Sequence, residues 1–352
     1  MFDFLIVGSG LAGLSFAEIA LQNNGSIYVI DDCKQNASYV AGGLYNPIIL
    51  KRFTKAWQSE KQLLFAEQFY RCLEQKFNTS VYHDLPVLRR FYSIEEQNNW
   101  FIAADKKELS NYLSSDLVKE NFNGLSAPFG YGKVNNTGYL NVAALMDSFR
   151  AYLKSKDLFK QEVFDYTELQ INNDVLSYCG ITAKHLVFAE GFGMLQNPFF
   201  SDLPMVSSKG ELLLIHAPEL KLDCIVNAGI FILPVGNGHF KIGATYNWQD
   251  QTTEPTQAGR DELLSQLDEI INCPYEVIDH YAGIRPTVSD RRPLVGTHHQ
   301  YKNIHLLNGL GTRGVLVGPS MAQALYEQIM HDKPVQAEAN INRIYRKRGI
   351  TI

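Results

Sequence analysis

The sequence predicts an α/β protein, α+β overall, in which a Rossmann-like nucleotide-binding domain is interrupted by a mainly antiparallel sheet. Three observations predict this class. The chain opens with a strand, a glycine-rich turn, a helix and a second strand. Short strands joined by turns begin near residue 211, which is typical of an antiparallel sheet. A second glycine-rich turn, at residues 309–314, leads into an apolar helix.

The N-terminal turn is typical of a dinucleotide-binding site. After an apolar strand, Gly8, Gly10 and Gly13 fit the pattern G-x-G-x-x-G. Such glycines allow a tight turn, a close approach of the backbone to a pyrophosphate, and close packing of helix on strand. The second strand, residues 26–30, ends at Asp31, where an acid is expected to hydrogen-bond a ribose hydroxyl.

The following segments predict the helices of the same domain. Helices are expected over residues 11–21, 60–77 and 141–154, the last two with an apolar stripe at helical spacing. The loop that carries Gly42 and Gly43 is apolar where a surface loop would be polar. Two adjacent glycines in this setting favour contact with a flat ligand over a plain turn.

The middle of the chain predicts a return to the first sheet. Residues 160–166 have strand character, a meander follows over residues 169–178, and an apolar strand is expected over residues 185–189. This strand ends in a second strand-to-glycine junction at Gly191.

A β-hairpin is expected in the antiparallel part of the chain. Strands are expected over residues 229–235 and 239–245, because the sequence between them holds the glycine and asparagine that such a turn favours. A helix is expected over residues 261–271, a strand over 305–308 and a helix over 315–330.

This order predicts two discontinuous domains. The nucleotide-binding domain takes residues 1–80, 138–205 and 281–352, and the substrate-binding domain takes residues 81–137 and 206–280. A chain of 352 residues is too long for one compact core of ordinary size, which agrees with such a division.

Composition narrows the function classes. The chain has 32 Lys and Arg against 37 Asp and Glu, a net charge of −5, which makes nucleic acid an improbable main partner. No apolar window approaches the ~18 residues of a membrane helix. The chain begins on its first strand without the features of a signal peptide, so we expect a cytoplasmic protein.

Metal and disulfide chemistry is not indicated. His298 and His299 are adjacent, and neighbouring residues on a strand point to opposite faces, so a surface turn is expected there and no metal site. The five cysteines form no C-x-x-C pair, which indicates neither a disulfide framework nor a zinc site. They are Cys33, Cys72, Cys179, Cys224 and Cys273.

Six short motifs follow one another along the chain. They are the N-terminal fingerprint, Ala41-Gly42-Gly43, Lys209-Gly210-Glu211-Leu212, Ile242-Gly243-Ala244-Thr245, Gly283-Ile284-Arg285-Pro286 with Asp290 and Pro293-Leu294-Val295-Gly296, and Gly311-Thr312-Arg313-Gly314 with Pro319. In this order they resemble the motifs of the FAD-dependent D-amino acid oxidase family, which includes glycine oxidase, sarcosine oxidase and the oxidase half of a bifunctional tRNA-modifying protein. The resemblance runs from Met1 to about Met330.

The resemblance implies FAD, bound non-covalently and extended across the first domain, with its flavin ring at the boundary with the substrate sheet. It implies that Asp31 meets the adenosine ribose and that the backbone of Val163 meets the adenine. A helix N-terminus after Thr312 would lie beside the flavin's pyrimidine edge, where negative charge gathers on reduction. The residues implied in cofactor binding are Gly8, Ser9, Gly10, Gly13, Asp31, Ser38, Ala41, Gly42, Gly43, Val163, Gly191, Gly311, Thr312, Arg313, Gly314 and Val315.

The resemblance also implies the reaction. A small amine or amino acid (glycine, an N-substituted glycine or a D-amino acid) would give a hydride from its α-carbon to flavin N5, followed by imine hydrolysis. Arg285 is the candidate for binding the substrate carboxylate through two parallel hydrogen bonds. The alternative for Arg285 is a structural ion pair with Asp290.

The chain also departs from the family pattern. Phe231 stands where several members have a substrate-contacting tyrosine. Thr312 aligns with a second arginine of glycine oxidase, and Arg313 follows one place later. Tyr246 and Tyr45 are candidates to replace the missing contacts, and Tyr246 and Thr312 join Arg285 as candidate catalytic residues. No cysteine lies near the C-terminal turn, so covalent attachment of the flavin is not expected.

Two other functions remain open. An RNA-modifying flavoprotein that acts on a carboxymethylated tRNA base would share the Gly42-Gly43 and Thr312-Gly314 motifs, although the net charge of −5 counts against it. An NAD-dependent dehydrogenase would share the first strand-helix-strand unit but leaves the C-terminal glycine turn unexplained.

Overall fold

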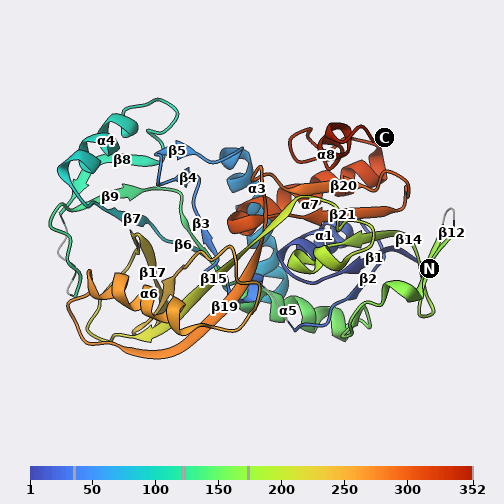
Figure 1. Cartoon of the computed structure of the whole chain (residues 1–352), viewed down its shortest axis with the longest axis horizontal. Helices are drawn as coiled ribbons and strands as arrows, with labels where there is room; N and C mark the ends of the chain where they lie inside the picture. The colour runs from blue at the N-terminus through green and yellow to red at the C-terminus, as the bar shows by residue number, and fades with distance from the viewer. Residues whose placement is uncertain (35–36, 120–121, 123, 173–174, 351–352) are drawn as a thin grey trace.

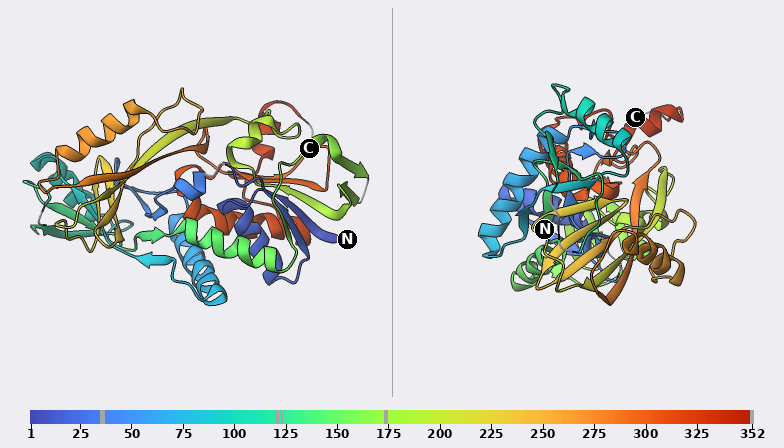
Figure 2. Two further views of the ribbon diagram at one scale, coloured as in Figure 1. Left: turned by 90° about the horizontal axis from the view of Figure 1, so that it is seen from below. Right: turned by 90° about the vertical axis from the view of Figure 1, so that its left-hand side faces the viewer.

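The molecule, described from a computed structural model, has two lobes that are each built on an eight-stranded sheet (Figure 1). The structure describes residues 1–34, 37–119, 122, 124–172 and 175–350. Both ends of the described chain lie in one lobe, which we call the nucleotide lobe (Figure 2). The other is called the substrate lobe.

The sheet of the nucleotide lobe has a parallel centre. Its order is β11-β2-β1-β14-β13-β12, with β21 also paired to β14 and β20 paired to β21. The pairs β11·β2, β2·β1, β1·β14 and β14·β21 are parallel. The strands are β1 (Phe2–Val7), β2 (Ile27–Ile30), β11 (Phe159–Lys160), β12 (Leu169–Asn172), β13 (Val175–Tyr178), β14 (Ile181–Phe188), β20 (Leu294–Thr297) and β21 (Ile304–Asn308).

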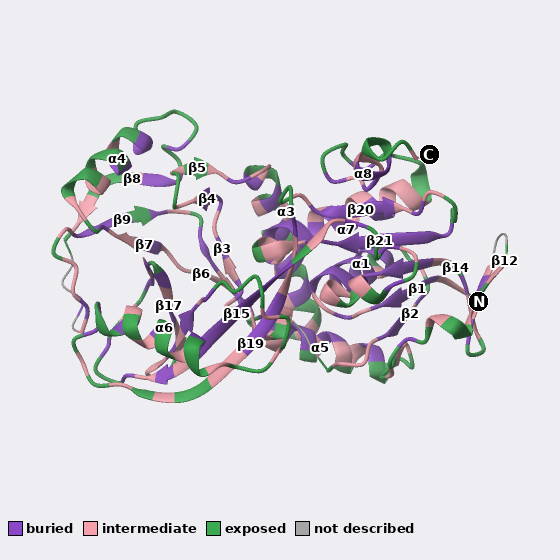
Figure 3. Ribbon diagram, in the orientation of Figure 1, coloured by how far each residue is buried: buried purple, intermediate pink, exposed green. Residues whose placement is uncertain are grey.

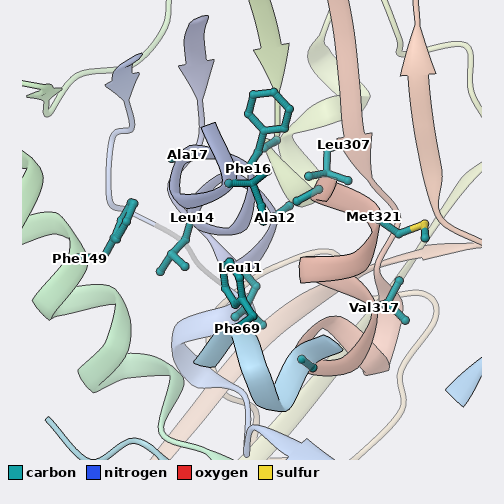
Figure 4. Packing of buried hydrophobic residues seen from close by; sticks show 14 of the residues in the cluster. Leu11, Ala12, Leu14, Phe16, Ala17, Phe69, Phe149, Leu307, Val317 and Met321 are labelled. Atoms are coloured by element: carbon teal, nitrogen blue, oxygen red, sulfur yellow. The ribbon is translucent and has the colours of Figure 1, made fainter. Parts of the chain in front are cut away.

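Helices cover this sheet, and their apolar sides make the largest core. Figure 4 shows Leu11, Leu14 and Phe16 of α1 among side chains of α3, α5 and α7. Parallel strands covered by helices lose contact with water, which explains the continuous apolar run at residues 4–7. The helices are α1 (Leu11–Gln22), α3 (Ser59–Phe77), α5 (Val142–Ser155) and α7 (Gly314–His331); α2 (Ala37–Val40) and α8 (Asn342–Lys347) are short.

Helix α7 contains a proline whose missing donor is replaced from another helix. Pro319 has no N–H, so the carbonyl of Val315, four residues earlier, cannot receive its helical hydrogen bond. The fully buried Tyr70 of α3 donates its hydroxyl to that carbonyl at 3.0 Å. The start of α7, next to the second glycine turn, is therefore fixed by α3.

The sheet of the substrate lobe is mainly antiparallel, with the order β19-β15-β18-β17-β16-β7-β9-β8 and one parallel pair, β16·β7. Helices α4 (Ile94–Ala104) and α6 (Gln257–Asp268) belong to this lobe. Its strands are β7 (Val87–Arg90), β8 (Leu113–Val118), β9 (Tyr131–Val134), β15 (Met205–His216), β16 (Ile225–Ala228), β17 (Ile230–Gly236), β18 (His239–Gly243) and β19 (Glu276–Val288).

Small elements join the lobes. A three-stranded sheet has the order β3-β10-β6, and β4 pairs with β5. Three short 3₁₀ helices follow strand ends or turns. These elements are β3 (Leu44–Tyr45), β4 (Ile48–Ile49), β5 (Thr54–Lys55), β6 (Tyr82–Asp84), β10 (Gly138–Leu140), η1 (Tyr166–Glu168), η2 (Gly191–Gln196) and η3 (Gly311–Arg313).

Most expected elements are present, and three expectations were wrong in detail. The strand expected near Leu212 is the 12-residue β15, and its partner β19 was not expected as a strand at all. Residues of β15 are buried on both faces (Figure 3), so the alternation that signals a strand is absent. The strand expected over residues 160–166 ends at Lys160.

The expected surface turn at His298 was also wrong, because this residue is buried. Its ring centroid lies 5.4 Å from that of Phe200, and its Nδ1 accepts hydrogen bonds from the N–H groups of Gln300 and Tyr301. Burial lowers the pKa of His298 to about 4, so the ring is neutral near pH 7. His298 therefore has a packing role.

The domain boundaries expected from the sequence stay a prediction.

We expect Tyr70→Phe to lower the free energy of unfolding by about 1–3 kcal/mol, because it leaves the buried Val315 carbonyl without a donor. Urea denaturation measures the change. Tyr152→Phe is the control, because no hydrogen bond of the Tyr152 hydroxyl is found among the described residues. Equal losses in the two variants would contradict this role of Tyr70.

Candidate active site

A cavity of about 1660 Å³ is lined by residues of both lobes. It brings together the two glycine turns, which lie at opposite ends of the sequence. Of the residues singled out from the sequence, Ser9, Gly13 and Tyr45 do not line it. Those that do are Gly8, Gly10, Asp31, Ser38, Ala41, Gly42, Gly43, Val163, Gly191, Phe231, Tyr246, Arg285, Gly311, Thr312, Arg313, Gly314 and Val315.

The N-terminal turn forms one end of the cavity, which we call the nucleotide end. Gly8 has a φ of 99°, a conformation that favours glycine. A Cβ atom on Gly13 would overlap the carbonyl of Gly8, so only glycine lets α1 pack this closely on the turn. Asp31 accepts a hydrogen bond from the N–H of Ser9 and so ties the end of β2 to the turn.

Arg150 of α5 reaches the same end of the cavity. Its Nε donates to Ser9 Oγ at 2.8 Å, and its Nη2 lies 3.9 Å from the Asp31 carboxylate. Nη2 is buried and has no hydrogen-bond partner among the described residues. A buried guanidinium donor without an acceptor suits an anionic ligand, because leaving it unpaired is costly.

Glu190, at the end of β14, also lines the nucleotide end. Part of the residue faces the cavity, but its carboxyl group is enclosed by Tyr166, whose hydroxyl lies 2.5 Å from Oε1, and by Asn197, which donates to Oε2 at 2.6 Å. Burial raises the pKa of Glu190 to about 7 against the opposing effect of these hydrogen bonds.

The second glycine turn lies between the nucleotide end and the substrate lobe. The side chain of Asn308, at the end of β21, donates to the carbonyl of Gly191 at 2.9 Å and so joins the turns after two neighbouring strands. Arg313 donates to the carbonyl of Asn46 at 2.8 Å. Thr312 lines the cavity within η3, directly before α7 begins.

Arg285 lies at the other end of the cavity, which we call the substrate end. It leaves β19 opposite Ser208 of β15, and its guanidinium lies against Gly210, where a Cβ atom would overlap Cζ and Nη2. The glycine in the Lys209-Gly210 motif is therefore needed to seat this side chain.

The hydrogen bonds of Arg285 leave one side of its guanidinium free. Nη1 donates to the carbonyls of Lys209 at 3.3 Å and Thr245 at 3.2 Å, and Nη2 donates to that of Thr245 at 3.2 Å. A guanidinium has five N–H groups, so the Nε–H and one Nη2–H remain. These two lie side by side, in the arrangement that pairs with both oxygens of a carboxylate.

No acidic side chain of the described chain forms an ion pair with Arg285. The alternative of a pair with Asp290 is wrong, because Asp290 binds Arg343 at 2.9 Å. Burial lowers the pKa of Arg285, and likewise that of Arg313. The Tyr246 ring centroid is 4.4 Å from Cζ of Arg285.

The aromatic candidates fall in different places. Phe231 of β17 lines the cavity and approaches Gly42 so closely that a Cβ atom there would lie 2.7 Å from the ring. Tyr246 lines the rim and is 58% exposed. Tyr45 is buried outside the cavity, where its hydroxyl donates to Asp84 at 2.7 Å and its ring stacks on Tyr82, so its role is structural.

Two polar residues of the cavity, Arg150 and Glu190, were not found from the sequence. Arg150 lies three residues after Asp147 on α5, and both residues line the cavity. Residues at this spacing lie on the same side of a helix, so this polar pair beside the apolar stripe could have indicated that α5 faces a ligand. Glu190 follows an apolar strand directly before Gly191, a position where a carboxylate is unusual. Its partner Asn197 follows seven residues later, at the end of η2, whereas Tyr166 precedes it by 24 residues, so neither contact leaves a periodic signal.

Comparison with known proteins gives one family match. The model of the DAO family, described as FAD dependent oxidoreductase, matches residues 3–328. Among the described residues, no helix is long and apolar enough to cross a membrane.

The chain is similar to curated proteins at low identity. It is 23% identical to a glycine oxidase of Bacillus licheniformis, over 96% of this chain and 95% of that protein. It is 24% identical to the tRNA 5-methylaminomethyl-2-thiouridine biosynthesis bifunctional protein MnmC of Legionella pneumophila, over 83% of this chain. The match spans only 45% of that bifunctional protein.

A solved structure shares the fold. The crystal structure of a glycine oxidase from Bacillus cereus superposes with a TM-score of 0.76 and 21% identity, covering 95% of this chain and 96% of that one. At this identity the likeness concerns the fold alone. The family match identifies FAD as the cofactor, and the alternative of an NAD-dependent dehydrogenase is not supported.

The residues present fit FAD. Gly8 and Gly10 of the turn line the cavity directly, and the unpartnered Arg150 Nη2 offers a donor to a pyrophosphate oxygen. The cavity continues from this turn past the second glycine turn to Arg285, as a long dinucleotide with a reacting ring at its far end requires. Cys33, at the nucleotide end, is the one cysteine among the described residues that line it.

We expect the free energy of unfolding to fall by about 3 kcal/mol as the pH rises from about 4.5 to about 7, through Glu190. The sign follows from proton binding: in this range the folded state keeps a proton on Glu190, whereas the unfolded state has lost it. Below this range the contribution is fully present. Urea denaturation at a series of pH values, with FAD in constant excess, measures it.

Glu190→Gln is the matching variant, because an amide keeps the hydrogen-bonding shape and cannot ionise. Its stability is expected to lose this part of the pH dependence and to exceed that of the parent protein above pH 7. An equally steep fall in the variant would assign the dependence to another group.

Proposed function

We propose that this chain, which belongs to the DAO family of FAD dependent oxidoreductases, oxidises a small amine or amino acid that carries a carboxylate. Glycine, an N-substituted glycine and a D-amino acid are the substrates in question. The enzyme is an FAD-dependent oxidase or dehydrogenase.

The observation that carries this proposal is the free side of the Arg285 guanidinium. A half-buried cation that binds only main-chain carbonyls, and that keeps two parallel N–H groups, is suited to a carboxylate. Arg313, which also lines the cavity, is a second cation without an ion pair among the described residues, and the ring of Tyr246 lies over Arg285. The cavity therefore offers the carboxylate of a substrate two cations that form no ion pair within the described chain.

The proposed cofactor contacts follow the cavity. Asp31 would meet the ribose, Arg150 the pyrophosphate, and the exposed rim residue Val163 the adenine. Gly42, Gly43 and the turn from Gly311 to Val315 would face the flavin. Bound FAD supplies the acceptor for a hydride from the α-carbon of the substrate.

The residues of this chain would position the substrate and exclude water from the substrate end of the cavity. Arg285 would hold the carboxylate and so fix the α-carbon at one distance from the ring, which converts binding energy into orientation. Phe231 forms an apolar wall against Gly42, and Tyr246 covers the Arg285 side. Little acid–base catalysis by side chains is needed, because the cofactor carries the chemistry and the protein fixes the geometry.

We expect the purified protein to be yellow, with the absorbance spectrum of a flavin. Anaerobic addition of glycine, sarcosine, proline and D-amino acids, each in turn, tests the substrate class through bleaching of this absorbance. A colourless protein that binds no FAD would overturn the cofactor assignment, and flavin that none of these amines reduces would overturn only the substrate class.

We expect Arg285→Ala to lower kcat/KM roughly 10–100-fold, mainly through KM, and to leave FAD bound, because hydrogen bonds to charged groups contribute ~1.5–3 kcal/mol. Arg285→Lys keeps the charge without the paired N–H groups and is expected to recover only part of the loss. Gly210→Ala displaces the guanidinium without removing it and is expected to raise KM as well. Loss of FAD in these variants would instead indicate a structural role.

A second candidate is action on a carboxymethylated group of a tRNA, which rests on the similarity to the bifunctional protein MnmC. The chain spans about half of that protein, and its net charge of −5 disfavours nucleic acid. Reduction of the flavin by tRNA, with a rate that falls steeply between 50 and 200 mM salt, would favour this candidate.

A further inference from the structure

A loop after β18 covers the substrate end of the cavity. Residues 244–256 connect β18 to α6, and Tyr246, Gln251, Thr253 and Glu254 of this loop line the cavity. We call this segment the covering loop. Its position decides where Tyr246 lies relative to Arg285.

The covering loop is anchored to a lysine that has no contact with water. Lys209 of β15 has a relative exposure of 0%, and its Nζ lies 2.6 Å from Asp250 Oδ2, 3.1 Å from Thr252 Oγ1 and 2.5 Å from the carbonyl of Glu254. All three groups belong to the covering loop. The lysine holds the pKa of Asp250 down to about 2, so the carboxylate stays charged at any pH of interest.

The main chain of Lys209 holds the same loop on its other side. The N–H of Lys209 donates to the carbonyl of Asn247 at 2.8 Å, and the N–H of Asn247 donates back at 3.0 Å. Glu211, two residues along β15, accepts hydrogen bonds from the N–H and hydroxyl of Thr256 at 2.9 and 2.8 Å. The loop is therefore fixed at its start, middle and end to one strand.

Lys209 also touches Arg285. Its carbonyl and that of Thr245, the second residue of the covering loop, are the two acceptors of the guanidinium. If the covering loop separates from β15, Thr245 moves with it. Arg285 then loses the carbonyl that holds its guanidinium in the orientation in which the Nε–H and one Nη2–H are free. The loop anchor and the carboxylate site are thus one connected set of bonds.

We propose that Lys209 is a positioning residue for substrate binding: its side chain fixes the covering loop, and through Thr245 it sets the orientation of Arg285. The proposal rests on the proposed function of Arg285 as the carboxylate-binding residue. Lys209 does not touch the substrate. Removing its ammonium group takes away the contacts with Asp250, Thr252 and the carbonyl of Glu254, and so releases the middle of the covering loop.

The test compares Lys209→Met and Asp250→Asn with the parent holoenzyme. Acetate is the probe of the carboxylate site, and its Kd is measured by titration of the flavin absorbance. Hydrogen exchange of the peptide that spans residues 244–256 reports on the loop. Lys241→Met is the matched control. Lys241 lies on β18, and burial lowers the pKa of its ammonium group. It does not line the cavity, and it has no ion pair among the described residues.

We expect Lys209→Met to raise the Kd for acetate about tenfold, to speed exchange in residues 244–256, and to raise the KM of a reducing amine far more than it lowers kcat. Asp250→Asn keeps an oxygen that can accept from the Lys209 ammonium and leaves the contacts with Thr252 and the Glu254 carbonyl in place, so it is expected to give the same changes to a smaller degree. It stands in if Lys209→Met does not fold. Lys241→Met is expected to change none of them.

Faster exchange in the loop with an unchanged Kd for acetate would overturn the proposal, because Lys209 would then stabilise the loop without orienting Arg285. Unchanged exchange would overturn it too. Failure of the proposed function has a different signature: no amine reduces the flavin, or Arg285→Ala leaves acetate binding unchanged, while the exchange comparison still reports on the anchor.

Discussion

The pairing of β15 with β19 is the constraint on which the candidate site depends. This antiparallel ladder extends from Met205 opposite Val288 to His216 opposite Glu276. Its register places Arg285 beside Ser208 and lets the guanidinium lie over Gly210. A shift of the register by one residue would turn Arg285 to the other face of the sheet and away from the cavity. The substrate end is therefore specified by strand pairing before any loop is considered.

The parts of the site that the sequence predicted are those whose signal is local. The turn at Gly8 and Asp31 is readable because strand, glycines, helix and acid lie within about thirty residues and their spacing follows from backbone geometry. Arg285 was identified through its motif, but its free N–H groups depend on the carbonyls of Lys209 and Thr245, which are 76 and 40 residues away in the chain. Contacts of that kind leave no periodic trace.

The strands β15 and β19 were underestimated for different physical reasons. Both faces of β15 are covered, so apolar and small residues replace the alternation that distinguishes a strand from a loop. Strand β19 is exposed or half-buried in its first half and contains Gly283 and Pro286, residues that disfavour a strand in the sequence. Arg150 and Glu190 were missed for another reason: Arg150 is a polar residue within the apolar pattern of α5, and Glu190 follows the apolar strand β14, and both patterns were read correctly. Both line the cavity, but only Arg150 has a buried donor that lacks a partner among the described residues, whereas the carboxyl group of Glu190 is bound by Tyr166 and Asn197.

Pro319 and Tyr70 carry a consequence for how this sequence can vary. The proline removes one donor from α7, and the tyrosine of α3 supplies a substitute to the Val315 carbonyl. A residue with an N–H at position 319 would restore the helical bond and make the hydroxyl at position 70 redundant. Related chains that lack the proline are thus free to carry phenylalanine at position 70, so the two positions should co-vary although about 250 residues separate them.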